Sequence, residues 1–299
     1  MKRTLLFFAL VSVLSPGLLA SNSYAAGATG RSGFMMFDSS SMIGSPVKDS
    51  HGKTTGFVNE VMVDSGGHAL AVIFHANDDP FEYGGGINIP VPFQELTISK
   101  TKAGQATVAV KTDMKHLDFA PYLDPLKMQS RRYESKIYEY YGIQPYWSLS
   151  GTAERGRFME LDSRDLIGAA VENSCGKVVG IVNEVIVDSR GHAFAIVNHG
   201  DSDLYGDGGV NTPVPLQELR ISQEKRGQEV VSLKTDMEHL DFAPYLDPLQ
   251  TSSRSYEARI YEYYGIQPHW TEGGYAGGMN PYRWGGKAQD FYREDYLIR

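Results

Sequence analysis

An internal repeat is the feature of the sequence that most constrains the fold. Residues 34–75 return at 158–199, which is 124 positions further on, without a gap. A copy of this length corresponds to a whole folding unit, so it limits the possible folds more than any single residue does. After one residue is lost from the second copy, the similarity continues to Trp147 and Trp270. The sequence therefore predicts two similar domains in tandem.

The first 25 residues have the features of a secretory signal peptide. Lys2 and Arg3 precede an apolar run from Leu5 to Leu14, and the small residues Ser23 and Ala25 follow. This order is typical of a cleaved signal, and the run is too short for a permanent membrane-spanning helix. We expect residues 1–25 to be removed, 26–33 to form a short leader, and the mature chain to be periplasmic or secreted without a transmembrane span.

The composition argues against nucleic acid as a partner and against internal disulfides as a source of stability. The formal net charge is -8, and an acidic chain repels phosphate backbones, so we expect no binding to nucleic acid. Cys175 is the single cysteine, so no internal disulfide can form. A thiol in a turn could still join two chains through an intermolecular disulfide.

Each copy begins with a pattern typical of short β-strands. Residues 56–64 alternate between apolar and polar side chains, residues 68–75 are nearly all apolar, and Asp64 to Gly67 form a hairpin turn between them. Pro90 and Pro92 in the next segment restrict it to a sheet edge or a strand end. Short strands separated by Gly and Pro turns favour closed sheets. We expect small antiparallel β-barrels at 34–111 and 158–234.

A short helical extension follows each predicted barrel, at 112–147 and 235–270. Thr112 or Asp113 is placed to cap a first helical turn. A second helix is expected from about 131 to 141, with Gly142 at its C-terminal end. Residues 148–157 form the expected linker, and the Gly-rich, aromatic tail at 271–299 has no counterpart in the first copy. The predicted fold is mainly β, with few short helices.

The residues of each predicted barrel resemble those of the PRC-barrel domain, a family named for the photosynthetic reaction centre. The resemblance rests on Met42-Ile43-Gly44, on the segment Gly56 to Asp64, on Val91-Pro92, and on their equivalents in the second copy. It implies a small β-barrel that serves in binding and assembly. It supplies no catalytic residues.

Cysteine and histidine residues are the first candidates for catalytic or metal sites. Cys175 could act with His192 or His199 as a thiol hydrolase, but its equivalent is His51 in a turn, which favours a turn residue. The histidines recur in pairs across the copies, yet His68 and His75 are seven residues apart on one strand and point to opposite faces. We therefore expect structural histidines, no catalytic residue and no cofactor.

Two sets of acidic residues are further candidates for a functional site. Asp201, Asp203 and Asp207 resemble the start of a calcium-binding loop, but an EF-hand would need Glu at the position of Thr212. A solvated loop is the favoured interpretation, and a calcium site remains the alternative. Glu60 and Asp64 are expected to be surface charges on the polar face of a strand.

The strongest functional candidates are aromatic residues of the extensions. The segments 116–126 and 239–249 are identical, as are 137–145 and 260–268. Tyrosine offers both apolar area and a polar group, so these residues could dock a partner, or they could cover the end of the barrel core. The predicted partner surface comprises Tyr138, Tyr140, Tyr146, Trp147, Tyr261, Tyr263 and Trp270.

The predicted function is a non-enzymatic binding or assembly module of the cell envelope. Its partner would be a protein or another envelope component, and it could be oligomeric. One alternative is an envelope enzyme or small-ligand-binding protein with a site between the two barrels. Another is a structural calcium-binding protein.

Overall fold

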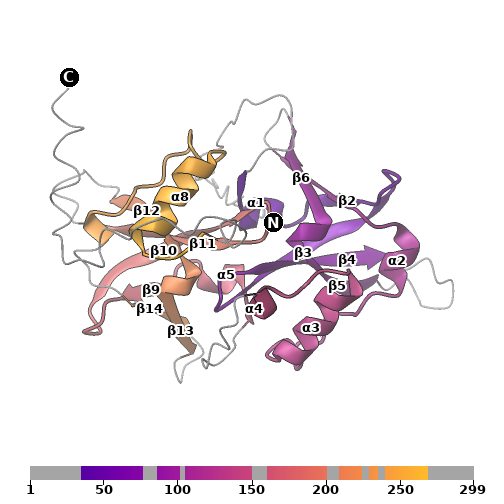
Figure 1. Cartoon of the computed structure of the whole chain (residues 1–299), viewed down its shortest axis with the longest axis horizontal. Coiled ribbons are helices and arrows are strands. Elements are labelled where there is room, and N and C mark those ends of the chain that lie inside the picture. The colour runs from indigo at the N-terminus through magenta and orange to yellow at the C-terminus, as the bar shows by residue number, and fades with distance from the viewer. Residues whose placement is uncertain are drawn as a thin grey trace, which may run out of the picture.

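Two curled β-sheets, each built largely from one repeat, make up most of the folded chain (Figure 1). The computed structural model describes residues 35–76, 86–101, 105–149, 160–200, 209–223, 229–234 and 240–268. The expectation of a mainly β fold with few short helices is confirmed. The predicted signal peptide, leader and tail lie outside the described ranges, as does most of the predicted linker.

The first sheet has the order β5-β4-β3-β2-β7-β6. Its strands are β2 (Pro46–Lys48), β3 (Thr54–Asp64), β4 (Ala69–Ala76), β5 (Gly86–Pro92), β6 (Leu96–Lys100) and β7 (Ala106–Val110). The expected hairpin joins β3 to β4, and β5, which contains Pro90 and Pro92, is an edge strand as expected. Between Val58 and Glu60 the register shifts by one residue, which increases the local twist and helps the sheet to curl.

The second sheet repeats this arrangement in the order β12-β11-β10-β9-β14-β13. Its strands are β9 (Ala170–Glu172), β10 (Val178–Asp188), β11 (Ala193–His199), β12 (Val210–Pro215), β13 (Leu219–Gln223) and β14 (Glu229–Leu233). The expectation of purely antiparallel sheets is wrong at one place in each, because β2 and β7 are parallel, as are β9 and β14. Alternation along a strand shows which side chains share a face, but it carries no information on the direction of the neighbouring strand.

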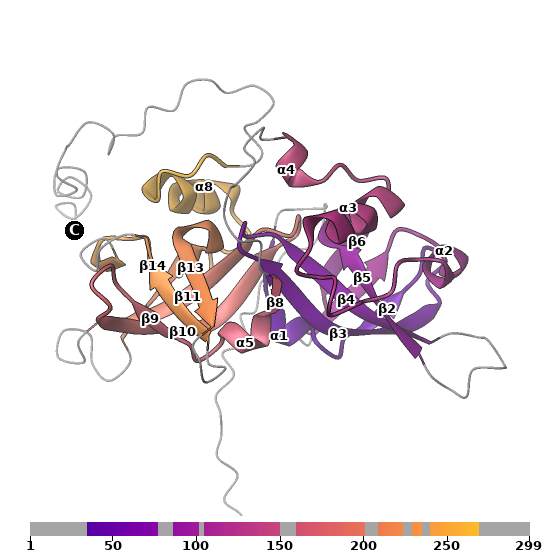
Figure 2. The same cartoon turned by 90° about the horizontal axis from the view of Figure 1, so that it is seen from below.

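The two repeats exchange their first strands. β1 (Met36–Asp38), from the first repeat, pairs with β10, whereas β8 (Glu160–Asp162), from the second, pairs with β3. Figure 2 shows β8 and the short helices α1 (Ser39–Met42) and α5 (Ser163–Leu166) where the two sheets meet. Each repeat thus completes the sheet of the other.

The two β-hairpin turns also meet at this junction. His68 and His192 form an isolated antiparallel bridge, the Ala69 N–H donates to the Gly191 carbonyl at 2.7 Å, and the Ala193 N–H donates to the Gly67 carbonyl at 2.8 Å. Gly67 and Gly191 have φ values of 78° and 91°, which favour glycine. A Cβ on Gly191 would lie 3.1 Å from the Ala69 carbonyl oxygen, so glycine also permits the close approach of the repeats.

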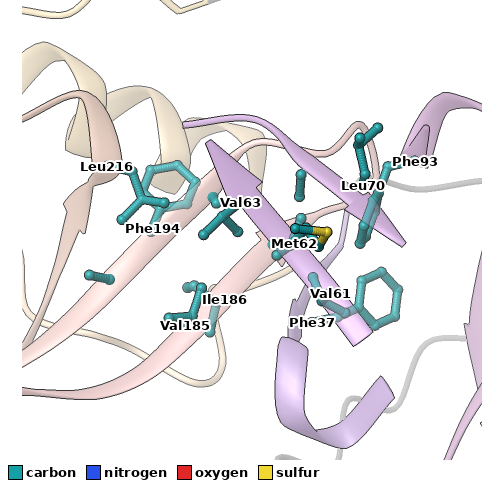
Figure 3. Packing of buried hydrophobic residues seen from close by; sticks show 14 of the residues in the cluster. Phe37, Val61, Met62, Val63, Leu70, Phe93, Val185, Ile186, Phe194 and Leu216 are labelled. Atoms are coloured by element: carbon teal, nitrogen blue, oxygen red, sulfur yellow. The ribbon is translucent and has the colours of Figure 1, made fainter. Parts of the chain in front are cut away.

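One continuous hydrophobic core spans both sheets (Figure 3). Val61, Val63 and Leu70 of the first repeat belong to the same buried cluster as Val185 and Phe194 of the second. Burial of each such side chain contributes about 1.5–3 kcal/mol. The repeats therefore stabilise each other through apolar packing as well as through the exchanged strands.

Short helices complete the fold. They include η1 (Phe93–Glu95), η2 (Leu216–Glu218), α2 (Met114–Asp118), α3 (Arg131–Tyr140), α4 (Tyr146–Leu149) and α8 (Arg254–Tyr263). The expected N-terminal cap of α2 is Asp113, whose carboxylate accepts the His116 N–H at 2.8 Å. Gly142, with a φ of 67°, follows α3 as predicted. None of the helices in the described ranges is long and apolar enough to cross a membrane.

Candidate functional site

The predicted aromatic surface is largely part of the core. Tyr138, Tyr261 and Tyr263 are buried, so the expectation that they contact a partner is wrong. The helices α3 and α8 lie against the edge strands β5 and β12, and this packing turns the three side chains inward. Tyr140, Tyr146 and Trp147 are half-buried, and Trp270 lies outside the described residues. The three buried tyrosines therefore agree with the alternative that these residues cover the core.

Tyrosine hydroxyl groups hold the chain segment that precedes each aromatic helix. Tyr133 donates to the Tyr122 carbonyl, and Tyr140 donates to the His116 carbonyl. In the second repeat the Tyr256 hydroxyl donates to the Tyr245 carbonyl at 2.7 Å. These bonds fix the backbone of residues 116–126 and of the equivalent residues 240–249.

A buried histidine ties each of these segments to its sheet. In the first repeat His75 Nε2 is 2.8 Å from Asp118 Oδ1, and His75 Nδ1 is 2.6 Å from Thr55 Oγ1. In the second repeat His199 contacts Asp241 at 3.5 Å and Thr212 Oγ1 at 2.8 Å. These contacts support the expectation that these histidines are structural.

Burial sets the protonation preference of the second of these histidines. It lowers the pKa of His199, and the charge of Asp241 acts in the opposite direction. The segments are also tied through their backbones, since the Leu123 N–H donates to the Asn88 carbonyl at 2.6 Å and the Leu246 N–H donates to the Asn211 carbonyl at 2.7 Å. Each segment is thus held at several points along its length.

The segments held in this way expose large apolar side chains. The same three positions are exposed in each repeat, with exposed fractions between 45% and 93%. We call them the first triad (Phe119, Tyr122, Leu126) and the second triad (Phe242, Tyr245, Leu249). The same exposed apolar positions therefore recur on the equivalent segment of both repeats.

The triads were missed by the sequence reasoning, although a signal for them was present. Residues 116–126 and 239–249 are identical, and Pro121 and Pro125 prevent the first of these segments from continuing as a helix. A segment without regular periodicity does not show which of its side chains point outward. Four of the predicted partner residues lie instead on the neighbouring helices, and the other three follow those helices in the sequence: Tyr138, Tyr140, Tyr261 and Tyr263, then Tyr146, Trp147 and Trp270.

Three buried carboxyl groups meet where the repeats exchange strands. Asp64 of β3, Glu134 of α3 and Glu160 of β8 are each at most 3% exposed, and we call them the junction cluster. The expectation that Asp64 is a surface charge is wrong, because the exchanged strand β8 covers it. Asp64 and Glu160 are directly opposite in the antiparallel register, a position in which Cβ atoms are about 4.5–5.5 Å apart. The half-buried Glu60, in contrast, lies farther along β3.

Hydrogen bonds are distributed unequally over the junction cluster. Asp64 accepts the backbone N–H of His68 at 2.8 Å and the hydroxyl of Tyr146. Gln129 donates its side-chain amide to the Glu160 carbonyl at 2.7 Å. One carboxyl oxygen each of Glu134 and Glu160 is buried without a hydrogen-bond partner among the described residues.

Burial and mutual repulsion set the protonation preferences of this cluster. Burial raises the pKa of Glu134 and of Glu160 well above their usual range, and the charge of Asp64 adds to the effect for both. Burial likewise raises the pKa of the Tyr146 hydroxyl. Close carboxyl groups that share a site cannot all ionise cheaply. Burial and repulsion therefore both favour the neutral forms of Glu134 and Glu160.

The second repeat has a smaller version of the cluster. Asp188 and Glu257 are fully buried, and burial, followed by the charge of Asp188, raises the pKa of Glu257 to about 9. His192 Nδ1 lies 3.1 Å from Asp188 Oδ2, and burial lowers the pKa of His192. Met36 lies opposite Asp188, at the position that Glu160 occupies in the junction cluster.

The described residues do not assemble the catalytic or metal sites considered from the sequence. Cys175 is exposed in a turn, where its N–H donates to Asn173 Oδ1 at 3.0 Å, and His192 and His199 are buried among other partners. Within the described ranges no group of three or more His, Cys, Asp or Glu residues is placed to hold a metal ion. The calcium candidates Asp201, Asp203 and Asp207 lie outside these ranges.

Comparisons with known proteins give no assignment. No protein-family model matches the chain, and no curated protein shows significant similarity to it. The functional conclusion therefore rests on the geometry of the triads and of the junction.

Proposed function

We propose that the protein is a non-enzymatic binding or assembly module of the cell envelope. In this proposal two PRC-like barrels act as a scaffold, and the two triads are the contact surfaces. The partner is a protein or another envelope component, and assembly into oligomers is compatible with the same surfaces. The signal-peptide pattern at residues 1–25 supports a periplasmic or secreted location.

The observation that carries the proposal is the exposure of the same three apolar side chains in both repeats. Aromatic and large aliphatic residues supply much of the binding energy at protein interfaces. The backbone of each segment is fixed by tyrosine hydroxyl groups, a buried histidine and a bond to the adjacent edge strand. A surface that is already ordered loses less conformational entropy when it binds.

Two copies of the surface permit bivalent binding. When one triad holds a partner, the other meets the same partner at a high effective concentration, so two weak contacts give one strong interaction. The shared core and the exchanged strands hold the two triads in a defined relation. This supports an assembly role more than a single weak contact would.

The alternative of a site between the repeats has one specific observation in its favour. The junction cluster brings together carboxyl groups from both repeats, as a cleft enzyme would require. However, Asp64, Glu134 and Glu160 are almost inaccessible to solvent, so a substrate could reach them only after the junction opened. The exposed triads need no such rearrangement, and for this reason the binding module is preferred.

Affinity capture from envelope extracts tests the proposal. The bait proteins are the wild type, a first-triad variant (Phe119→Ser, Tyr122→Ser, Leu126→Ser), the equivalent second-triad variant, and a variant with all six changes. We expect a partner that the wild type retains, that each single-triad variant retains less well, and that the six-change variant loses.

A matched control removes exposed apolar side chains elsewhere. Val178 and Ile181 on β10 are exposed at 54% and 47%, and they lie outside both triads. The Val178→Ser, Ile181→Ser variant should retain the partner. Retention by the six-change variant at the wild-type level would contradict the proposed role of the triads.

A further inference from the structure

We propose that the junction cluster is a proton-dependent latch, which holds β8 of the second repeat on β3 of the first. The latch is closed while Glu160 retains its proton and opens when that proton is lost. This property is separate from the proposed binding function, because it concerns the junction of the repeats and not the triads.

The geometry couples protonation to strand exchange. Glu160 is the first residue of β8, and its side chain enters the cluster only because β8 pairs with β3 opposite Asp64. Glu134 reaches the same place from α3 and is almost fully buried there. Release of β8 would return Glu160 to water and uncover its two neighbours. The pairing of β8 and the burial of the three carboxyl groups are therefore one event.

Negative charge in the cluster opposes the pairing of β8 with β3, because that pairing buries the three carboxyl groups. Two buried oxygens, one on Glu134 and one on Glu160, have no hydrogen-bond partner among the described residues, so ionisation of both glutamates would leave charge without compensation. The proton of Glu160, in addition to that of Glu134, removes the second of these charges. The closed junction binds this proton more tightly than the open junction does, and by linkage the open state gains population as pH rises.

The other ionisable groups at the junction define the surroundings of the latch. Arg131 on α3 favours ionisation of Glu134, but burial and the two acidic neighbours act more strongly in the opposite direction. The groups that face the cluster from neighbouring elements are His68, Arg131, Tyr138 and Tyr146, and His192 lies beside His68. A second set of charged groups lies farther along β3 and β8 and in α5: Glu60, Asp162, Arg164 and Asp165. Of these, Glu60 is the most important competitor, because burial and then Asp162 raise its pKa.

The second repeat provides an internal comparison. β1 pairs with β10 as β8 pairs with β3, but Met36 replaces the carboxyl group of Glu160. Release of β1 therefore uncovers one carboxyl group fewer than release of β8 does. Glu257 beside Asp188 also retains a proton, so opening at β1 rises with pH as well, and opening at β8 should be steeper by the one proton of Glu160.

Hydrogen exchange followed by mass spectrometry tests the latch on the intact protein. Peptides that contain β8 and β1 are compared between pH 6 and pH 9, after correction for the intrinsic pH dependence of amide exchange. One additional proton lost on opening raises the opening constant about tenfold per pH unit. We expect this additional slope at β8 relative to β1 in the wild type, and we expect Glu160→Gln to remove it.

Glu60→Gln is the matched control, since Glu60 is also an acidic residue of β3 whose pKa burial raises, but it lies outside the residues that pair with β8. It should leave the slope at β8 unchanged. The latch is refuted if β8 opens no more steeply with pH than β1 in the wild type, a comparison that needs no variant. It is also refuted if Glu160→Gln keeps the wild-type slope, or if Glu60→Gln alone removes it.

Discussion

Replacement of Glu257 by Gln should make the stability of the protein less dependent on pH. Glu257 is fully buried on α8 beside Asp188, and these surroundings raise its pKa from 4.5 to about 9. Glutamine has nearly the same shape as a protonated glutamate, but it cannot ionise. The substitution therefore removes one titrating group with little change in packing.

The sign and the size of the effect follow from proton linkage. Between pH 4.5 and about 9 the folded state retains the Glu257 proton while the unfolded state has lost it, so stability falls as pH rises. The stabilising contribution of the Glu257 proton is fully present below pH 4.5 and is lost as pH rises through the pKa of the folded state. Each pH unit in this window lowers the free energy of unfolding by about 1.4 kcal/mol. From pH 5 to pH 8 the wild type should lose up to about 4 kcal/mol through this group alone, and the variant should not.

Urea unfolding followed by circular dichroism at several pH values measures this loss. At pH 5 the two proteins should have similar free energies of unfolding, whereas at pH 8 the variant should be the more stable. Glu262→Gln, at an exposed position of the same helix, should behave as the wild type does. Equal pH slopes for Glu257→Gln and the wild type would refute the inference that Glu257 is protonated in the folded state.

Three further predictions concern separate features of the fold. Tyr256→Phe removes the hydroxyl that holds the Tyr245 carbonyl and should lower the free energy of unfolding by about 1 kcal/mol in a urea titration. Leu117→Ala in α2 removes a fully buried side chain and should cost about 2–5 kcal/mol in the same assay, whereas an unchanged midpoint would show that α2 is not packed as described. Excess calcium or EDTA should leave the melting temperature unchanged if the loop with Asp201, Asp203 and Asp207 is only solvated, and an increase with calcium would favour the calcium alternative.

Sequence reasoning was most successful where local chemistry decides the structure. The β3 to β4 hairpin, the edge position of β5, the cap at Asp113 and the end of α3 at Gly142 were all predicted, because each depends on a few neighbouring residues. The tyrosine surface was predicted less well. Helical periodicity shows that Tyr133, Ile137 and Tyr141 share one face of the helix, but it does not show what lies against that face.

The repeat by itself determined that the chain has two similar β-rich units, each with a short aromatic helical extension. Only the tertiary structure decided that the units exchange their first strands, since nothing local to β1 or β8 distinguishes pairing within a repeat from pairing between repeats. That exchange buries Asp64 with Glu160, which are almost a hundred positions apart in the sequence. Burial, and with it the protonation of a carboxyl group, depends on which distant residues displace water from it. For the same reason the triads became visible only in the folded chain, where side chains of one segment separate into those that pack and those that remain exposed.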